Sequence, residues 1–435
     1  MNELITALKA QWRGSRAFRL WTVLALIGLV LNLALTVLWQ MEIIAIEDSP
    51  PANDLKIYLE AGNRFLQRED LYVAPRPDFG LFAYSPAFAM LFSMLNFLPY
   101  KVVWAVDALL HMVAYGLLYW RWFLIFRRQG LSSAAEQLIR LFPLWIIFTG
   151  LLYEMAYMNI YIFMALLATL LLEAMLEQDA AKAILWLAIL LPIKPQWAFA
   201  LGLPALLGQW RFLAKVAGGA ILAYLAVMLV TVLFAGPYAL EQYQEYVQFL
   251  QSVPRTFIWN TMAKDGHIGY NNSLLQLVNF FTNMAAYSLS LTTAIKILLS
   301  LPLIAVFWRY RQQAPRKPTP GFALEWTFAL YLLAFLWLDV VTELTFGIVI
   351  FSYLLGTLPE SRLKALSRIV FLPYAFILLW ITFSGIAYFF APLPDIVVDP
   401  SLFVPFILIA MLGFYGLVIW QLNNKLRSQV LRNLA

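Results

Sequence analysis

Long apolar runs separated by short charged segments dominate the hydrophobic pattern of the chain. A helix needs roughly 20 apolar residues to cross a bilayer, so the pattern predicts about twelve spanning segments. They are residues 20–41, 102–126, 138–154, 159–177, 181–193, 196–209, 216–235, 285–307, 322–338, 344–358, 369–390 and 402–421. The segments 181–193 and 196–209 are too short to cross alone, so we expect them to be tilted, pinched or re-entrant.

Two long polar segments, about 42–101 and 236–284, interrupt this pattern and are predicted to be large loops. The first contains an amphipathic helix from Asp54 to about Gln67 and a shorter apolar piece, 83–98, bracketed by Pro86 and Pro99. We expect both to lie at the membrane interface, because a further span at 83–98 would move every later loop to the other side and disturb the charge pattern.

Composition supports this class of fold. Of the 435 residues, 63% are hydrophobic and only 12% are charged, which excludes a protein folded around a water-facing surface. We therefore expect an all-α polytopic membrane protein, with residues 1–435 forming a single transmembrane domain with amphipathic interfacial helices in its external loops.

The distribution of charge predicts the orientation in the membrane. Most of the 30 Lys and Arg fall at the N-terminus or in the loops on its side, and most of the 24 Asp and Glu fall on the other side. The positive-inside rule then places both termini in the cytoplasm and the two large loops outside the cell membrane. The net charge of +6 is therefore attributed to topology, and no nucleic-acid partner is expected. Basic residues precede the first apolar run, which lacks a small-residue cleavage site, so we expect that helix to be retained.

Several kinds of chemistry are excluded by what the chain lacks. It has no Cys, which rules out disulfides and thiolate chemistry, and its two His, His111 and His267, do not form a pair with ligand spacing. No P-loop and no dinucleotide-binding glycine pattern is present. Catalysis would depend on carboxylates, amides and a few cations, with no cofactor and no metal expected.

Asp54 is the first candidate for such chemistry. Its position at the start of a predicted helix is typical of an N-cap, in which the side chain would bind free backbone N–H groups. A cap does not explain Tyr58, Ala61 and Gly62, which fall on a similar face one or two turns later. Both interpretations of Asp54 therefore remain open.

Three further polar clusters are predicted near the external side. Glu154 and Asn159 in LLYEMAYMNIYIF could simply be the solvated end of a helical hairpin. Lys194, between Pro192 and Pro195, could extend to the headgroups or, at a helix break lining a cavity, bind a phosphate. Asn271, Asn272 and Ser273 open an apolar segment, where Ser273 could be an ordinary N-cap.

These motifs together resemble glycosyltransferase family 87, a group of polyprenol-phosphate-sugar-dependent enzymes of GT-C architecture. The residues that carry the resemblance are Asp54, Tyr58, Ala61, Leu71, Tyr72, Tyr84, Ser85 and Pro86, then Asn159, then Lys194, Pro195 and Arg211, then Asn271, Asn272, Ser273 and Leu274. The chain departs from the family in its late external turn, WLDVVTELTF, where family members carry Trp and His. Asp339 and Glu343 are expected to occupy that region.

The resemblance implies transfer of a hexose, mannose in this group, from a polyprenyl-phosphate donor to a lipid or glycan acceptor at the external face. Asp54 would be the general base, in an inverting displacement without metal. Lys194, Arg64 and His267 would bind the donor phosphate. The sugar or acceptor would be held by Tyr58, Tyr84, Asn159, Asn271, Asn272, Ser273, Asp339 and Glu343.

Two other functions fit the residues. In a transporter or flippase of lipid-linked or amphipathic solutes, Lys194, Glu154 and the broken helices would form a midplane site. The chain lacks a convincing internal repeat, and its polar clusters gather on one face, which disfavours a path across the membrane. The third function is a non-catalytic scaffold whose loops bind a partner.

Overall fold

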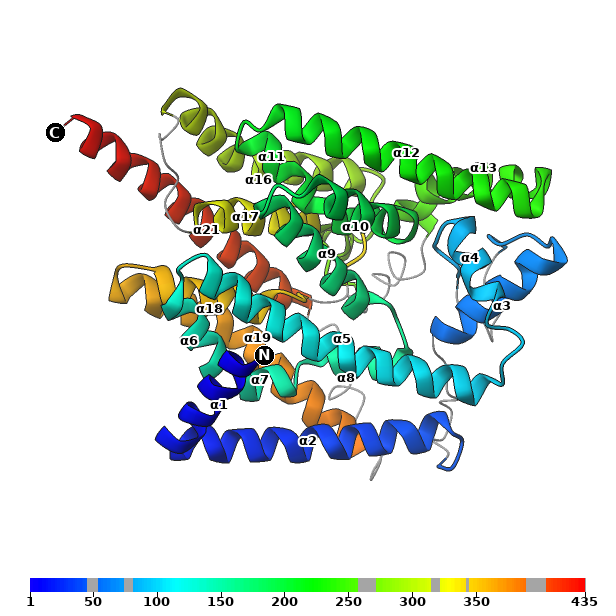
Figure 1. Ribbon diagram of the computed structural model, residues 1–435, viewed down its shortest axis with the longest axis horizontal. Helices are drawn as coiled ribbons and strands as arrows, with labels where there is room; N and C mark the ends of the chain where they lie inside the picture. Colours follow the sequence, from blue (N-terminus) through cyan, green and yellow to red (C-terminus); the bar gives the residue numbers. More distant parts are fainter. Residues whose placement is uncertain are drawn as a thin grey trace.

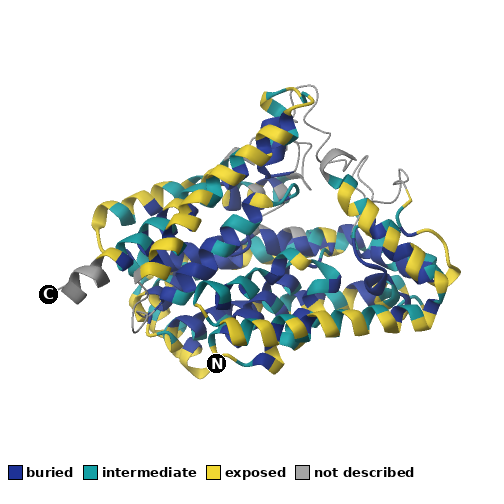
Figure 2. Cartoon of the chain, turned by 90° about the horizontal axis from the view of Figure 1, so that it is seen from above, coloured by how far each residue is buried: buried dark blue, intermediate teal, exposed yellow. Residues whose placement is uncertain are grey.

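The computed structural model describes residues 1–44, 54–73, 81–256, 271–313, 321–341, 344–388 and 404–434 (Figure 1). Within these ranges all regular structure is helical and no strand is present, which confirms the expected all-α fold. The helices lie roughly side by side in a bundle. Figure 2 shows that buried residues gather along its middle and exposed residues on its outer faces.

Six helices of the described ranges are long and apolar enough to cross a membrane. They are α2 (Arg16–Gln40), α5 (Tyr100–Arg128), α12 (Trp210–Ala235), α16 (Ser288–Gln313), α19 (Ser361–Tyr388) and α21 (Val404–Leu434). A bent pair adds a seventh at most, because α6 (Ser132–Arg140) meets residues 142–157 at 60°. Those residues form α7 (Phe142–Ile146) and α8 (Thr149–Tyr157). The chain is thus a helical multi-pass membrane protein.

The twelve complete spans expected from the sequence are not found among the described helices. Four of the predicted spans are apolar helices of 10–17 residues, α9 (Tyr161–Leu176), α10 (Ala180–Ile193), α17 (Phe322–Trp337) and α18 (Gly347–Thr357). Another, 196–209, is divided into η1 (Pro195–Gly202) and α11 (Leu203–Leu206). Most residues of α17 and α18 are buried against protein, so their apolar character reflects core packing and does not by itself indicate a span.

The long helices show the opposite distribution. On α12, large apolar side chains are exposed, with Leu222 at 69% and Leu233 at 77% relative accessibility. An apolar surface of this kind is unfavourable in water and suits the hydrocarbon of a bilayer.

The two predicted external loops meet at one end of the bundle. Their helices α3 (Asp54–Gln67), α4 (Pro86–Ser93) and α13 (Pro237–Thr256) gather there, whereas the C-terminus lies at the other end (Figure 1). Two hydrogen bonds join the first loop to α13: the backbone N–H of Leu71 donates to Gln242 Oε1 at 2.8 Å, and Tyr238 Oη donates to the carbonyl oxygen of Glu69 at 2.5 Å.

The remaining described helices are α1 (Asn2–Gly14) and α15 (Leu274–Phe281).

The amphipathic helix of the first loop packs as its sequence predicts. The buried face of α3 includes Tyr58, Ala61 and Gly62. Gly62 lies directly against the backbone of α4, where an added Cβ would be 2.6 Å from the backbone nitrogen of Ser93. With eight residues, α4 is too short to span a membrane.

Candidate active site

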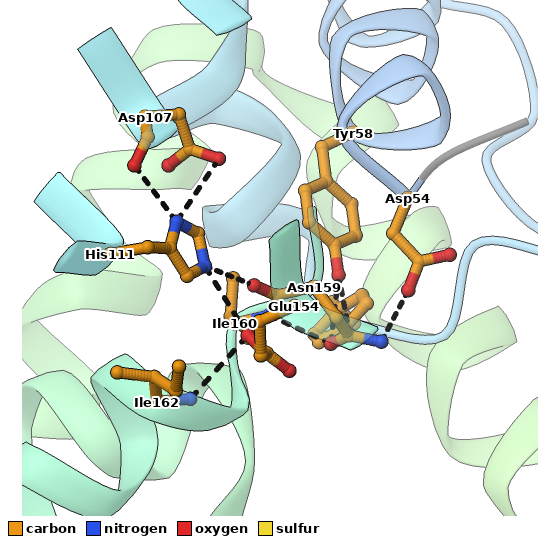
Figure 3. Close-up of polar contacts among 9 residues, drawn as sticks. Asp54, Tyr58, Asp107, His111, Glu154, Asn159, Ile160 and Ile162 are labelled. Carbon is orange, nitrogen blue, oxygen red and sulfur yellow. Dashed lines mark hydrogen bonds and ion pairs between the residues drawn. The ribbon is translucent and has the colours of Figure 1, made fainter. Parts of the chain in front are cut away.

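Asp54 is the first residue of α3, and its side chain points away from its own helix toward Asn159 (Figure 3). Asn159 Nδ2 donates a short hydrogen bond to Asp54 Oδ2, across 105 residues of sequence. The carboxylate is therefore held by a distant loop. Among the described residues we find no hydrogen bond from the backbone of α3 to this carboxylate, so the N-cap interpretation fails.

Two tyrosines complete the contacts around Asn159. Tyr58 lies one turn after Asp54, and Tyr84 lies two residues before the start of α4; their hydroxyl oxygens are 2.9 Å apart. Both hydroxyls also lie near Asn159 Oδ1, at 3.3 and 3.5 Å. A Tyr hydroxyl has one proton, so one tyrosine can donate to Asn159 while the other donates to its neighbour.

The orientation of the Asn159 amide follows from its contacts. The backbone N–H of Ile160 donates to Oδ1 at 2.8 Å, and an N–H group cannot accept. The oxygen of the amide must therefore face Ile160 and the tyrosines, and the NH₂ group must face Asp54. Asn159 can only donate to the Asp54 carboxylate.

The other carboxylate oxygen, Asp54 Oδ1, makes no hydrogen bond with the part of the chain that the structure describes. Figure 3 shows it pointing away from the Asn159 network. Asp54 is half-buried. This leaves one oxygen held in place and the other available to accept a proton.

Behind Asn159 lies a charged cluster that joins α5 to α8. His111 Nε2 is 2.6 Å from the carbonyl oxygen of Asn159 and 3.2 Å from Glu154 Oε2, and Nδ1 is 2.8 Å from the carbonyl oxygen of Asp107. His111 and Glu154 are buried, with 0% and 2% relative accessibility. The interpretation of Glu154 as a solvated hairpin end was wrong, because the left-handed backbone of Met158 (φ 53°) turns this end of α8 inward, toward α5.

Lys194 lies where the helix breaks between α10 and η1. Pro195 cannot donate a backbone hydrogen bond, and the extended backbone of Lys194 (φ −140°) ends α10. Ser85 Oγ donates to the carbonyl oxygen of Pro192, which the break has left without a helical partner. This contact places Tyr84 beside the break. The Lys194 ammonium lies 5.1 Å from the ring centroid of Tyr84 and 3.9 Å from that of Tyr161.

The electrostatic environment of Asp54 suits a group that exchanges protons near neutral pH. Burial raises the pKa of the Asp54 carboxyl from its ordinary value of 3.8 to about 7. The ammonium of Lys194 lowers this pKa and the carboxylate of Glu154 raises it. Lys194 takes part in none of the ion pairs between described residues, so its charge is balanced mainly by aromatic rings and by Asp54.

The residues at the start of α15 hold the main chain of a neighbouring turn. Asn271 Nδ2 donates to the carbonyl oxygen of Asp339 at 2.6 Å, and Asn271 Oδ1 accepts from the backbone of Val341 at 2.8 Å. The backbone N–H of Asn272 donates to the carbonyl oxygen of Val341 at 2.6 Å. Ser273 caps α15 by accepting from the backbone of Gln276, so the cap interpretation is confirmed.

This turn borders the Lys194 region. A narrow pocket there is lined by Tyr161 and Gln196 together with Leu338, Val340 and Val341. The carboxylate of Asp339 instead faces α16, where the buried Lys296 Nζ contacts Asp339 Oδ1 at 2.6 Å.

The remaining candidates do not join this site in the described structure. Arg64 pairs with Glu60 at 3.0 Å on α3, ten residues after Asp54, which corresponds to roughly 15 Å along a helix. His267 and Glu343 lie outside the described residues.

Asp107 and His111 belong to the site, although the sequence motifs did not single them out as site residues. Both lie in an apolar span four residues apart, and ionisable residues within a span are a signal of function that could have revealed them. The described residues contain no group of three or more His, Asp or Glu with the arrangement of a metal site.

Comparison with known proteins identifies the family. Residues 82–338, more than half of the chain, match glycosyltransferase family 87. This segment includes Tyr84, Asn159 and Lys194, whereas Asp54 and Tyr58 precede it. No curated protein and no solved structure matches the chain. With this match, on a helical multi-pass fold, the chain belongs to glycosyltransferase family 87.

Proposed function

We propose that this glycosyltransferase moves a hexose, most simply mannose, from a polyprenyl-phosphate donor to a lipid or glycan acceptor at the external face of the cell membrane. The observation that carries the proposal is the Asp54 carboxylate. One of its oxygens is fixed by Asn159, and the other has no partner among the described residues. Lys194 supplies positive charge beside it.

In the proposed reaction the acceptor hydroxyl transfers its proton to Asp54 Oδ1 as its oxygen attacks the anomeric carbon of the donor sugar. The bond between that carbon and the phosphate oxygen breaks, and its electron pair leaves on the polyprenyl phosphate. A pKa near 7 allows Asp54 to be ionised before attack and protonated afterwards. The displacement inverts the anomeric configuration.

Lys194 is the proposed contact for the departing phosphate, because an ammonium near the developing charge stabilises it more as the bond breaks. Of the other two expected contacts, His267 stays a candidate for this role, whereas Arg64 is paired with Glu60 about 15 Å along α3 from Asp54. A leaving phosphate that is already carried on a lipid reduces the need for a metal, so the proposal includes no metal and no cofactor.

The sugar and acceptor would be held by the polar groups around these two residues. Tyr58, Tyr84 and Asn159 form one wall, where their mutual hydrogen bonds fix the amide that contacts Asp54. The opposite wall would be the turn held by Asn271, Asn272 and Ser273, with Asp339 and Glu343 in or beside it.

The replacement Asp54→Asn tests this proposal. We expect transfer of radiolabelled mannose from polyprenyl-phosphate-mannose to a panel of glycan and lipid acceptors to fall at least about 100-fold, because the amide cannot take the proton. Binding of the donor, measured separately by fluorescence quenching, should change little.

Glu69→Gln is the matched control, since Glu69 is an exposed carboxylate in the same loop and should keep full transfer. Full activity of Asp54→Asn would rule out Asp54 as the base. If the wild-type protein transfers a different sugar from the same class of donor, mannose is the wrong assignment and the role of Asp54 stands.

A further inference from the structure

The proposed reaction leaves one buried charged cluster without a role. Asp107, His111 and Glu154 lie behind Asn159, on the side opposite Asp54 (Figure 3). His111 and Glu154 are almost completely buried, and charged groups are costly to bury unless each finds partners. The cluster therefore requires an explanation beyond packing.

The contacts of His111 determine its protonation state. Its Nε2 faces the carbonyl oxygen of Asn159 at 2.6 Å, and its Nδ1 faces the carbonyl oxygen of Asp107 at 2.8 Å. A carbonyl oxygen can only accept, so both ring nitrogens must carry a proton. His111 is therefore an imidazolium, and Glu154 Oε2 at 3.2 Å and Asp107 Oδ2 at 3.5 Å balance its charge.

The same contacts connect His111 to Asp54 through one residue. The imidazolium donates to the main-chain carbonyl of Asn159, and the side-chain amide of Asn159 donates to Asp54. Between Glu154 and Asn159, Met158 adopts a left-handed backbone, a conformation that costs a β-carbon-bearing residue energy and persists only when its surroundings hold it. The bond from His111 to Asn159 is one such restraint.

We propose that Asp107, His111 and Glu154 form a charged triad that fixes Asn159 and sets the electrostatic field at Asp54, so that all three are positioning residues for sugar transfer. This inference rests on the proposed role of Asp54 as the base. None of the three side chains needs to touch the substrate.

The triad acts on Asp54 in two separable ways. The first is positional, because the His111 donor holds Asn159. The second is electrostatic: Glu154 faces Asp54 together with Lys194, Tyr58 and Tyr84, and His111 partly neutralises Glu154. Loss of the His111 charge therefore exposes Asp54 to an uncompensated carboxylate, whereas loss of the Glu154 charge removes that carboxylate.

Paired variants separate this effect from simple damage to the fold. The side chain of His111→Gln keeps an N–H donor for Asn159 but has no charge, and Glu154→Gln removes the carboxylate. The pKa of Asp54 can be measured from the carboxyl ¹³C shift in aspartate-labelled protein in lipid bilayers, assigned by its absence in Asp54→Asn. We expect His111→Gln to raise this pKa by about one unit and Glu154→Gln to lower it by about one unit.

Glu177→Gln is the control. Glu177 is an exposed carboxylate that forms salt bridges with Arg128 and Lys182, so its replacement should leave the pKa of Asp54 unchanged. Shifts of the same sign in both variants, or no shift in either, would overturn the electrostatic role. A structural role alone predicts no pair of opposite shifts.

The positional role is tested by rate. At a pH well above the pKa of Asp54, His111→Gln should keep transfer within about threefold of wild type, whereas His111→Ala should lose at least tenfold, because a misplaced base costs rate. Equal rates for the two variants would contradict the positional role. If instead Asp54→Asn keeps full activity, the proposed function fails, and the NMR result still decides the electrostatic inference.

A last measurement needs no variant of the triad. The chain has two His, so ¹⁵N-histidine labelling of His267→Asn leaves a single signal. We expect both ring nitrogens of His111 to show imidazolium shifts at pH 7. A neutral tautomer would overturn the inference.

Discussion

Asn159 connects the two halves of the site because its backbone and its side chain face different partners. Its carbonyl oxygen accepts from His111, and its amide contacts Asp54, Tyr58 and Tyr84. A substitution at this one position would therefore release the Asp54 carboxylate but keep the main-chain carbonyl oxygen that His111 contacts.

At Asp54 the raised pKa predicts the pH dependence of activity. A general base must be ionised, so kcat/KM should rise with pH and level off above an acid limb near pH 7. The limb can be measured by single-turnover transfer between pH 5 and 9. A limb near the ordinary carboxyl pKa of 3.8 would contradict the environment described for Asp54.

The same pKa has a consequence for stability, with the opposite sign. The folded protein holds the Asp54 proton up to about pH 7, whereas the unfolded chain releases it near 3.8. The unfolded state therefore binds fewer protons between these values, and this contribution to the free energy of unfolding decreases as the pH rises from about 4 to 7. Asp54→Asn should unfold at a higher temperature than wild type at pH 8, and this difference should shrink toward pH 5.

At the scale of elements, the contact between α3 and α4 sets the position of Asp54. Gly62 allows the two helices to approach until its Cα faces the backbone of Phe92 and Ser93. The same contact aligns Tyr58 with Phe88 and Tyr84, whose rings lie 5.1 Å from that of Tyr58. Any separation of these helices would move Asp54 and both tyrosines.

Gly62→Ala tests this contact. The new Cβ would lie 2.6–2.9 Å from backbone atoms, so α3 and α4 must separate, and we expect a loss of about 1–3 kcal/mol in the free energy of unfolding together with slower transfer. The measurement is thermal unfolding in detergent with a parallel rate assay.

Gly116→Ala in α5 is the matched control. A Cβ there meets nothing within 4 Å, and alanine favours a helix by up to about 1 kcal/mol over glycine. Its unfolding temperature should be unchanged or higher. Equal destabilisation by the two substitutions would show that the loss of stability does not come from separating α3 and α4.

Broken and short elements provide the rest of the site. The break at Lys194 frees the carbonyl oxygen of Pro192, which binds Ser85, and the turn at Met158 brings Glu154 to α5. Uninterrupted helices would satisfy their own carbonyl oxygens and leave no such docking point.

For the whole molecule, the arrangement at one end of the bundle agrees with the charge pattern. The helices of both large loops pack together there, and Lys and Arg of the opposite loops pair with Glu173, Glu177 and Asp179 elsewhere. We therefore expect the end that carries α3, α4 and α13 to be external and the opposite end to be cytoplasmic.

Single cysteines test this topology, because the natural chain has none. Glu69→Cys, exposed after α3, should react with a membrane-impermeant maleimide in intact cells. Ala181→Cys, exposed at the start of α10, should react only after the membrane is permeabilised. The reverse pattern would place the candidate site on the cytoplasmic side.

The class of the protein and several of its site residues follow from the amino-acid sequence alone. A composition that cannot face water requires a helical membrane protein, because lipid leaves no other way for an open chain to satisfy its backbone. Asp54, Asn159 and Lys194 were predicted because each is a polar residue at a helix end or break, where such a residue is visible against an apolar background. Their roles in the reaction remain predictions.

The number of apolar helices long enough to span, and the residues that support Asp54, are evident only in the folded chain. An apolar run has the same composition whether it faces lipid or protein, so α17 and α18 could not be distinguished from spans. Residues 54, 111 and 159 are distant in sequence, and no periodicity links them. Their contact depends on the packing of α3, α5 and the turn at Met158, which local sequence does not encode.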